Sequence, residues 1–225
     1  MHTTIDVVLP CLDEAAALPA VLSGLPPGYR ALVVDNGSTD GSPVIAAEYG
    51  ARVVHESTRG YGAAVHTGLL AADADLVCVL DADGSFDPAE LPRLVAAVLD
   101  GRADLAVGRR RPVSADAWPW HARAGNALVA ALLRRRGVPV YDISPIRVAR
   151  QAALLQLGVN DRAFGYPLEL LLRAAGAGWR IVELDVTYAP RAAGTRSKVS
   201  GSVRGTVRAA RDFAGVLRAG IGGAR

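Results

Sequence analysis

The sequence has little cysteine and no long uncharged apolar stretch. Its two cysteines, Cys11 and Cys78, lie at or near apolar runs, so we expect buried free thiols and a reducing compartment. A membrane span needs about 18 consecutive apolar residues, and the longest candidate, 126–133, is soon closed by the three arginines 134–136. The first residues also lack a signal-peptide pattern. We therefore expect a cytoplasmic protein, either free or peripheral on the inner face of the cell membrane.

Acidic residues are almost missing from the end of the chain. From Tyr188 onward the only acid is Asp212, whereas eight residues are basic: Arg191, Arg196, Lys198, Arg204, Arg208, Arg211, Arg218 and Arg225. This imbalance predicts an anionic partner such as phosphate, pyrophosphate or lipid headgroups, and we expect no nucleic-acid partner. Disorder is not expected for the body of the chain, because 51% of the residues are hydrophobic and only 21% are charged.

Short apolar runs alternate with helical patterns in the first half. We expect strands at 5–9, 31–35, 52–55, 76–80 and 103–107, separated by helices at 14–25, 41–49, 63–72 and 88–99. Wholly apolar strands between helices predict a doubly wound α/β fold, in which a mostly parallel sheet is covered on both faces. Later we expect helices at 121–135 and 167–175, a loop running into a strand at 142–148, a strand at 179–188 and a basic amphipathic helix at 200–219. No linker or repeat divides the chain, so residues 1–225 are predicted to form a single domain.

Polar clusters follow the predicted strands, where parallel sheets bind ligands. Asp81 and Asp83 are one residue apart at the end of the strand 76–80. Two such carboxylates can share Mg²⁺ or Mn²⁺, and a bound cation would offset the charge of a departing diphosphate. Taken alone the pair is a weak signal, since two solvated loop aspartates would look the same.

Two further loops have both a structural and a functional interpretation. Asp35-Asn-Gly-Ser-Thr-Asp40 has a turn-forming Asn-Gly, and Asp40 can cap the next helix; Asp35 can also accept hydrogen bonds from a base or ribose. Arg59-Gly-Tyr-Gly62 precedes a helix. Its glycines would leave backbone N–H groups free for an anion, although a simple loop is the other interpretation.

The order of these motifs carries more information than any one of them. Pro10-Cys-Leu-Asp-Glu14, the Asp35 motif, the Gly60 loop and Leu80-Asp-Ala-Asp-Gly84 together resemble the family 2 glycosyltransferases with the GT-A fold. The resemblance continues through Tyr141-Asp-Ile-Ser-Pro-Ile-Arg147, Gly165-Tyr-Pro-Leu-Glu169 and Gly194-Thr-Arg-Ser-Lys198. These later motifs are similar to the branch that contains the dolichyl-phosphate mannose and glucose synthases.

The resemblance implies a role for each matching residue. A nucleotide-sugar half at about 1–112 would precede an acceptor half at about 113–225. Asp81 and Asp83 would hold Mg²⁺ or Mn²⁺, with Asp83 also catalytic, and Glu169 matches the catalytic base of related inverting enzymes. The nucleotide sugar would be bound by Pro10, Leu12, Glu14, Asp35, Gly60, Asp81, Ala82, Asp83, Arg196 and Lys198.

The acceptor side is less defined by the sequence. Arginine binds phosphate through a planar pair of donors, so Arg109, Arg123 and Arg147 are candidates for an acceptor phosphate, whereas Arg110 and Arg111 are expected to solvate the surface. The chain departs from the branch at Ser85, where a glutamine is common, which leaves the third side-chain ligand of the metal unassigned.

We therefore predict an inverting transfer of a hexose from a GDP- or UDP-sugar to a polyprenyl phosphate. A glycosyltransferase acting on a hydroxyl of a small molecule or glycan is the alternative. A sugar-phosphate nucleotidyltransferase is a more distant one, because such enzymes carry a glycine-rich basic loop after the first strand and this chain has Pro10-Cys-Leu-Asp-Glu14 there. A nucleotide-sugar sensor without catalysis has no support in the sequence.

Overall fold

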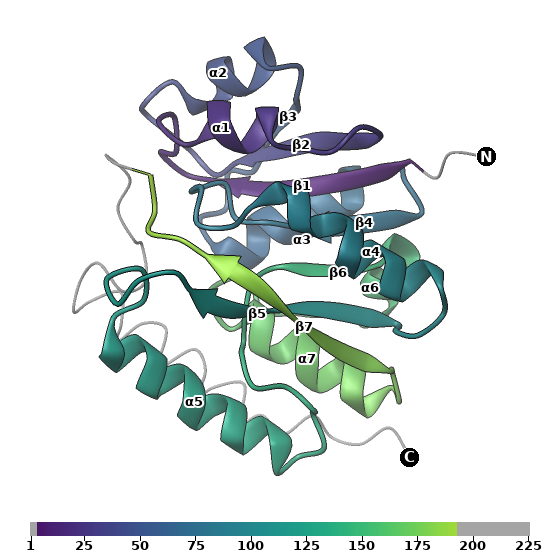
Figure 1. Ribbon diagram of the computed structural model, residues 1–225. Coiled ribbons are helices and arrows are strands. Elements are labelled where there is room, and N and C mark those ends of the chain that lie inside the picture. The colour runs from purple at the N-terminus through teal and green to yellow at the C-terminus, as the bar shows by residue number, and fades with distance from the viewer. Residues whose placement is uncertain (1–3, 193–225) are drawn as a thin grey trace.

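The computed structural model describes residues 4–192, which form one seven-stranded sheet with helices on both faces (Figure 1). The strand order is β3-β2-β1-β4-β6-β5-β7. Neighbouring strands are parallel except at β6, which runs antiparallel to both β4 and β5. The strands are β1 Ile5–Cys11, β2 Tyr29–Asp35, β3 Arg52–His55, β4 Leu76–Val79, β5 Leu105–Pro112, β6 Arg147–Arg150 and β7 Ile181–Tyr188.

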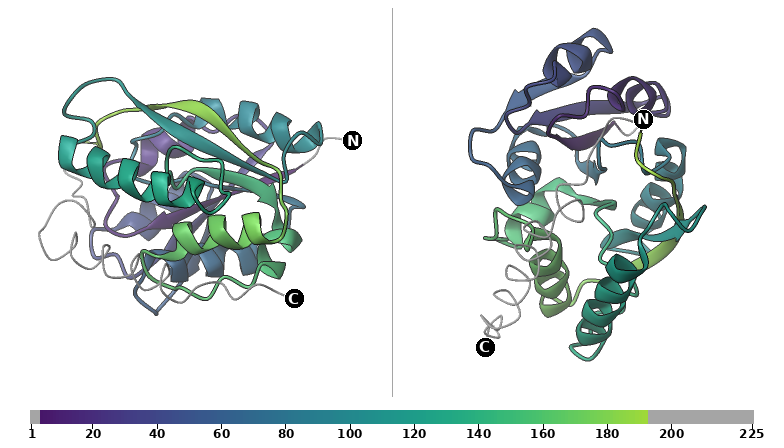
Figure 2. Two further views of the ribbon diagram at one scale, coloured as in Figure 1. Left: turned by 90° about the horizontal axis from the view of Figure 1, so that it is seen from below. Right: turned by 90° about the vertical axis from the view of Figure 1, so that its left-hand side faces the viewer.

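The helices divide between the two faces of the sheet, as the two rotated views in Figure 2 show. One face is covered by α1 (Leu18–Ser23), α2 (Ser42–Glu48) and α4 (Leu91–Leu99), with the short 3-10 helix η1 (Pro88–Glu90) leading into α4. The other face is covered by α3 (Tyr61–Ala71), α6 (Gln151–Gln156), α7 (Tyr166–Gly176) and the end of α5 (Trp120–Arg134).

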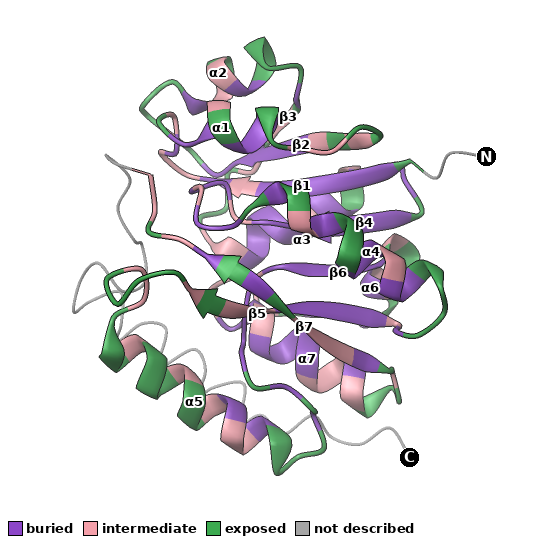
Figure 3. Ribbon diagram, in the orientation of Figure 1, coloured by how far each residue is buried: buried purple, intermediate pink, exposed green. Residues whose placement is uncertain are grey.

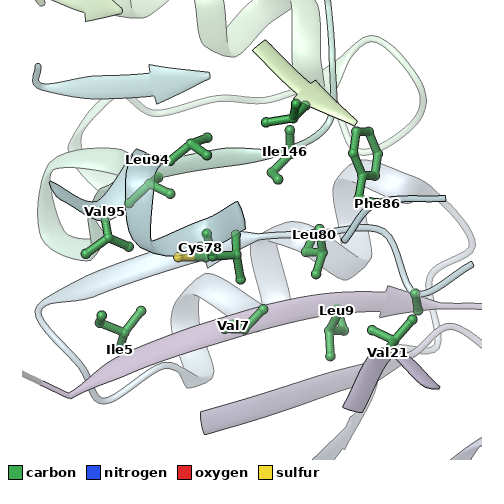
Figure 4. Close-up of a cluster of buried hydrophobic side chains, with 14 of the residues drawn as sticks. Ile5, Val7, Leu9, Val21, Cys78, Leu80, Phe86, Leu94, Val95 and Ile146 are labelled. Atoms are coloured by element: carbon green, nitrogen blue, oxygen red, sulfur yellow. The ribbon is translucent and has the colours of Figure 1, made fainter. Parts of the chain in front are cut away.

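Two apolar clusters hold these layers together. The central strands β1 and β4 are buried along almost their whole length (Figure 3), as expected for strands covered on both faces. In the first cluster, Leu9, Cys78 and Leu80 from the sheet pack near Val21 of α1 and Leu94 of α4 (Figure 4). Both cysteines are free and buried, which confirms their expected role as small core residues.

The doubly wound α/β prediction is confirmed, and the first-half strands lie within two residues of their expected starts. The sequence did not indicate that β6 enters the sheet between β4 and β5, nor did it indicate α6. The expected helix 14–25 is shorter, because only Leu18–Ser23 is helical. The predicted helix 200–219 lies outside the described residues. Within residues 4–192, no helix combines the length and apolar character needed to cross a bilayer.

The topology gathers several loops at one edge of the sheet. Strands β1, β2 and β4 are parallel neighbours, so the residues that follow Cys11, Asp35 and Val79 emerge side by side. The polar clusters predicted from the sequence are therefore brought together at the carboxyl ends of the parallel strands.

Candidate active site

Two aspartates follow β4 at this edge: Asp83 is buried and Asp81 is partly buried. Asp83 is 2% exposed, and its carboxylate accepts a hydrogen bond of 2.9 Å from the backbone N–H of Ser85. Burial, and next the negative charge of Asp83, raise the pKa of Asp81. Two carboxylates that repel each other in a poorly hydrated place are stabilised by a nearby cation.

Arg191 supplies a positive charge to this pair. Its Nη1 lies 2.8 Å from Oδ2 of Asp83, and the next residue, Ala192, donates its N–H to the carbonyl oxygen of Asp83 at 3.1 Å. Burial alone would lower the pKa of Arg191, but the charges of Asp83 and Asp81 outweigh it and raise that pKa. The segment after β7 is thus fastened to the aspartate loop through both side chain and backbone.

Hydrogen bonds join the loop after β1 to the loop after β2 at the same edge of the sheet. Asp13, at φ 55°, donates its N–H to Ser38 Oγ and accepts the N–H of Thr39. The N–H of Glu14 reaches Ser42 Oγ at 2.9 Å. Asp40 bonds Ser42 but also accepts the N–H of Ala15, so it joins two loops, whereas the residue at the N-cap of α2 is Gly41.

The first-half residues that are predicted to bind the nucleotide sugar lie in or beside these two loops. Pro10 pairs with Val34 in the sheet, and Leu12 and the buried Glu14 follow directly. The carboxylate of Asp35 accepts N–H groups from Gly37 and Ser38 and lies 3.2 Å from His55 Nδ1. Burial alone would raise the pKa of Asp35, but these hydrogen bonds outweigh it and lower that pKa.

The backbone N–H groups of the loop before α3 are bonded within the chain. The N–H of Gly60 is bound by Asn36 Oδ1 at 2.8 Å, and those of Gly62 and Ala63 by the carbonyl oxygens of Ala163 and Arg162. Of the two interpretations of this loop, the structure therefore favours the simple loop over N–H groups left free for an anion. A Cβ on Gly60 would lie 2.1 Å from the Arg162 oxygen, so glycine is needed for close backbone contact.

A buried layer of Arg147, Tyr61 and Tyr166 lies behind the aspartates. Arg147 is 2% exposed and donates from Nη2 to the Pro167 oxygen at 3.3 Å. Among the described residues, its Nε, Tyr61 Oη and Ser85 Oγ are buried without a hydrogen-bond partner. The charge of Asp81 acts on both Tyr61 and Arg147. Arg147 therefore lies in the interior near Asp81, away from the cavity that contains the other two candidate acceptor arginines.

That cavity, of about 450 Å³, lies between the end of β5, α5 and residues 141–142. Arg109 and Arg123 line it, together with the aromatic rings of Trp118, Trp120 and Tyr141. Arg109 stacks over Tyr141 at 4.8 Å and lies 3.9 Å from Glu183. Guanidinium groups beside aromatic rings suit an anionic ligand that carries an apolar part.

Arg110 departs from the surface role expected for it. It donates to Asp142 from its backbone N–H, from Nε at 2.9 Å and from Nη2 at 2.6 Å. Its guanidinium also lies 3.9 Å from the centre of the Trp118 ring. Arg110 is therefore a partly buried residue that fixes the wall of the cavity, and the expectation that it merely solvates the surface is wrong. Arg111 does lie at the surface, paired with Asp185 at 2.9 Å.

Glu169 is held by the chain itself. Its carboxylate accepts the N–H groups of Asn160 and Asp161 and the Nε of Arg173 at 2.6 Å. Burial alone would raise its pKa, but these hydrogen bonds outweigh it and lower that pKa. In this conformation Glu169 fastens α7 to the loop at 160–163, which in turn binds the start of α3.

A second cavity, of about 520 Å³, lies at the opposite end of the sheet, around the start of β1 and β2. Its charged groups pair with one another: Asp6 with Arg30 and Asp73 with Arg52, each at 2.8 Å. None of the site residues predicted from the sequence lines this cavity, so it is not the candidate active site.

Sequence reasoning missed Arg191, Tyr61 and Asp142 as parts of the site. Arg191 was visible only as one of many basic residues in the tail, and Tyr61 only as the variable position of the glycine loop. Asp142 was visible only as part of the motif Tyr141-Asp-Ile-Ser-Pro-Ile-Arg147, and nothing local indicated its partner Arg110, which is 32 positions away. Arg196 and Lys198 lie outside the described residues.

Comparisons with known proteins agree with this geometry. The family model described as "Glycosyl transferase family 2" matches residues 6–157. An uncharacterized glycosyltransferase of Mycobacterium tuberculosis is 60% identical over 210 residues, 93% of this chain and 95% of that protein. The polyprenol monophosphomannose synthase of Mycolicibacterium smegmatis is 32% identical over 219 residues, covering 87% of this chain and 81% of that protein.

A solved structure is similar over most of the chain. The glucosyl-3-phosphoglycerate synthase of Mycobacterium tuberculosis, in complex with Mn²⁺, uridine diphosphate and glucosyl-3-phosphoglycerate, superposes with a TM-score of 0.75 at 25% identity. The match covers 96% of this chain and 79% of that one. The matching family model, the relatives and the shared fold support the resemblance found in the motifs: the chain is a glycosyltransferase and belongs to glycosyl transferase family 2.

Proposed function

We propose that this protein is a metal-dependent inverting hexosyltransferase that moves a hexose from a GDP- or UDP-sugar to a polyprenyl phosphate. The observation that carries the proposal is the pair of the partly buried Asp81 and the buried Asp83, with Arg191 2.8 Å from Asp83, in the same domain as a basic and aromatic cavity. The first feature suits a diphosphate with its cation, and the second suits an anionic acceptor.

The residues of the aspartate loop fit a divalent cation. Asp81 and Asp83 offer the oxygen ligands that Mg²⁺ and Mn²⁺ prefer, and Ser85 adds a buried hydroxyl that has no partner among the described residues. Within residues 4–192, no group of three or more His, Cys, Asp or Glu side chains is gathered, so diphosphate oxygens and water would fill the other positions. When bound, the cation would neutralise charge on the departing diphosphate.

The protein's own residues would hold the donor and keep it oriented. Asp35, Glu14 and Pro10 line the edge where a nucleoside would lie, and Arg191 would turn from Asp83 to the diphosphate. Arg147 would stay buried as the fixed positive charge behind Asp81. Each of these groups acts by binding or positioning, and none needs to exchange a proton.

A phosphate acceptor fits the state of Glu169. An acceptor hydroxyl needs a base to remove its proton, whereas a phosphate monoester is largely ionised near neutral pH, with a second pKa of about 6. The lowered pKa of Glu169 and its three donors favour a positioning role. A phosphate oxygen bound near Arg109 and Arg123 would attack C1 of the sugar, and the C1–diphosphate bond would break.

The names of two relatives support the acceptor class. Proteins named dolichyl-phosphate hexose transferase and undecaprenyl-phosphate mannosyltransferase, from Haloferax volcanii and Micrococcus luteus, are 32% and 31% identical to this chain. Such a lipid acceptor would require the protein to work at the cytoplasmic face of a membrane. The second candidate, transfer to a hydroxyl of a small molecule, is favoured by the likeness to the glucosyl-3-phosphoglycerate synthase.

Thermal unfolding in the presence of nucleoside diphosphates tests the donor site. GDP and UDP, each with and without Mn²⁺, should raise the melting temperature of the wild type in a metal-dependent way, because a ligand that binds only the folded state stabilises it. Asp83→Asn should abolish the metal-dependent part. If no nucleoside diphosphate produces a metal-dependent shift, the proposed function fails. Transfer to polyprenyl phosphate, compared with 3-phosphoglycerate, then distinguishes the two acceptors.

A further inference from the structure

Helix α5 presents an apolar stripe where a surface helix would normally be polar. Trp120, Ala124, Ala127, Leu128 and Ala131 occupy positions i, i+4, i+7, i+8 and i+11 of the helix, which share one face, and only Ala131 among them is partly buried. Trp120 is 79% exposed and Leu128 is 64% exposed. The buried residues of the helix, Ala130 and Leu133, lie on its other side. Figures 1 and 3 show α5 at the margin of the molecule, mostly exposed.

The charge of α5 itself and of the turn that follows it has one sign. Residues 117–141 contain no aspartate or glutamate, but they contain four arginines, Arg123, Arg134, Arg135 and Arg136, all of them exposed. On a helical projection Arg123 and Arg134 fall on one flank of the stripe. An apolar stripe flanked by arginines is complementary to an anionic bilayer, where apolar side chains enter the headgroup boundary and cations meet lipid phosphates.

The stripe is continuous with the candidate acceptor cavity. Trp120 and Arg123 belong both to α5 and to the lining of the 450 Å³ cavity. Just before the helix, Val113 is 60% exposed, and across the cavity Tyr141 is 55% exposed. A bilayer that covered α5 would therefore lie against the mouth of this cavity, at the depth where tryptophan and tyrosine side chains are enriched.

We propose that this face of α5, defined by Trp120, Ala124, Ala127, Leu128 and Ala131, is a peripheral docking surface for an anionic lipid bilayer. Docking would bring the cavity to the level of the lipid phosphates, so that an acceptor phosphate would reach Arg109 and Arg123 without leaving the membrane. The lipid-acceptor part rests on the proposed function, whereas docking itself does not.

Vesicle sedimentation of the full chain, without donor or acceptor, tests the docking surface alone. The wild type should sediment with vesicles of phosphatidylglycerol and phosphatidylcholine at low salt and detach at high salt. Leu128→Asp should reduce the partition coefficient about tenfold or more, because it places a charge in the stripe. The matched control is Leu70→Asp, on α3, because Leu70 is 63% exposed and the change is the same; this variant should bind like the wild type.

Three outcomes would overturn the proposal: no binding by the wild type, equal binding by both variants, or a stripe that is buried by a second copy of the chain in solution. Equal binding would assign the membrane contact to another part of the chain. Sedimentation equilibrium of the wild type and Leu128→Asp detects the second copy. The sedimentation test contains no nucleotide, so it is independent of the thermal-shift test of the proposed function. Either proposal can therefore fail while the other holds.

Discussion

At the scale of single residues, the most informative contact is the ion pair between Arg191 and Asp83. A guanidinium 2.8 Å from the carboxylate occupies a place that a divalent cation would also favour. The two cations should therefore compete for Asp83 when no nucleotide is bound. Metal binding would release Arg191, the residue best placed to meet an incoming diphosphate.

Arg191→Met should make metal-free protein less stable by about 1–3 kcal/mol, because it leaves a buried carboxylate without its partner. The same variant should bind Mn²⁺ more tightly than the wild type, as measured by titration with electron paramagnetic resonance detection. Arg52→Met, which removes another 2.8 Å pair to an exposed aspartate, is the control; it should cost less than about 1 kcal/mol and leave Mn²⁺ affinity unchanged. Equal Mn²⁺ affinity in all three proteins would exclude competition.

Glu169 offers a second test at this scale. Glu169→Gln should lower stability near neutral pH by about 1–3 kcal/mol, because three donors lose their charged acceptor. The pKa of Glu169 in the folded protein is lowered from 4.5, so its charge contributes stability above pH 4.5 and loses it as pH falls through the folded value. The difference in free energy of unfolding between Glu169→Gln and the wild type should therefore shrink as the pH falls. Urea unfolding at several pH values measures this.

The activity of the same variant separates the two acceptor classes. If the acceptor is a phosphate, kcat of Glu169→Gln should stay near the wild-type value at a temperature where both proteins are folded. A loss of about a hundredfold or more in kcat, the size expected for a missing base, would instead assign the base role to Glu169. Arg173→Gln removes only the ion-pair partner of Glu169, so it is the control for the loss of that ion pair.

At the scale of elements, the site depends on close contact between α3 and the loop at 160–163. Gly62→Ala would place a Cβ 2.7 Å from the Asp161 oxygen and 2.8 Å from Tyr166 Cβ, so it should destabilise the protein by about 1–3 kcal/mol through overpacking. Gly125→Ala, in α5 with no atom within 4 Å of the new Cβ, should instead stabilise by about 0.5–1 kcal/mol, since alanine favours a helix. Denaturant unfolding of both variants checks the opposite signs.

The elements also show what could be predicted and what could not. The motif residues at Asp35, Asp81 and Asp83 were found because local strand patterns place them at strand ends, and the sheet confirms those positions. The position of β6 between β4 and β5 was not found, because pairing of Arg147–Arg150 with strands some 40 to 70 residues away leaves no local periodicity. Arg110 was misjudged for the same reason, since its burial depends on the distant Asp142.

At the scale of the whole molecule, the position of β6 argues against two independent halves. The sequence suggested a nucleotide-sugar half at 1–112 and an acceptor half at 113–225. In the sheet, however, β5 of the first half pairs only with β6 and β7 of the second, and β6 alone joins β5 to β4. Cutting the chain at 112 would leave β5 without either neighbour. The proposed donor and acceptor regions therefore share one sheet, joined through β6.

Unfolding should therefore be a single cooperative transition. All three tryptophans, Trp118, Trp120 and Trp179, lie in the second half, so tryptophan fluorescence reports that half while far-ultraviolet circular dichroism reports the whole chain. The two thermal curves should coincide, as expected for a two-state domain. A nucleoside diphosphate with Mn²⁺ should shift both midpoints equally, although its proposed site lies mainly in the first half. A fluorescence transition that comes earlier, and does not move with the nucleotide, would show that the acceptor half unfolds on its own and that β6 does not bind the two halves together.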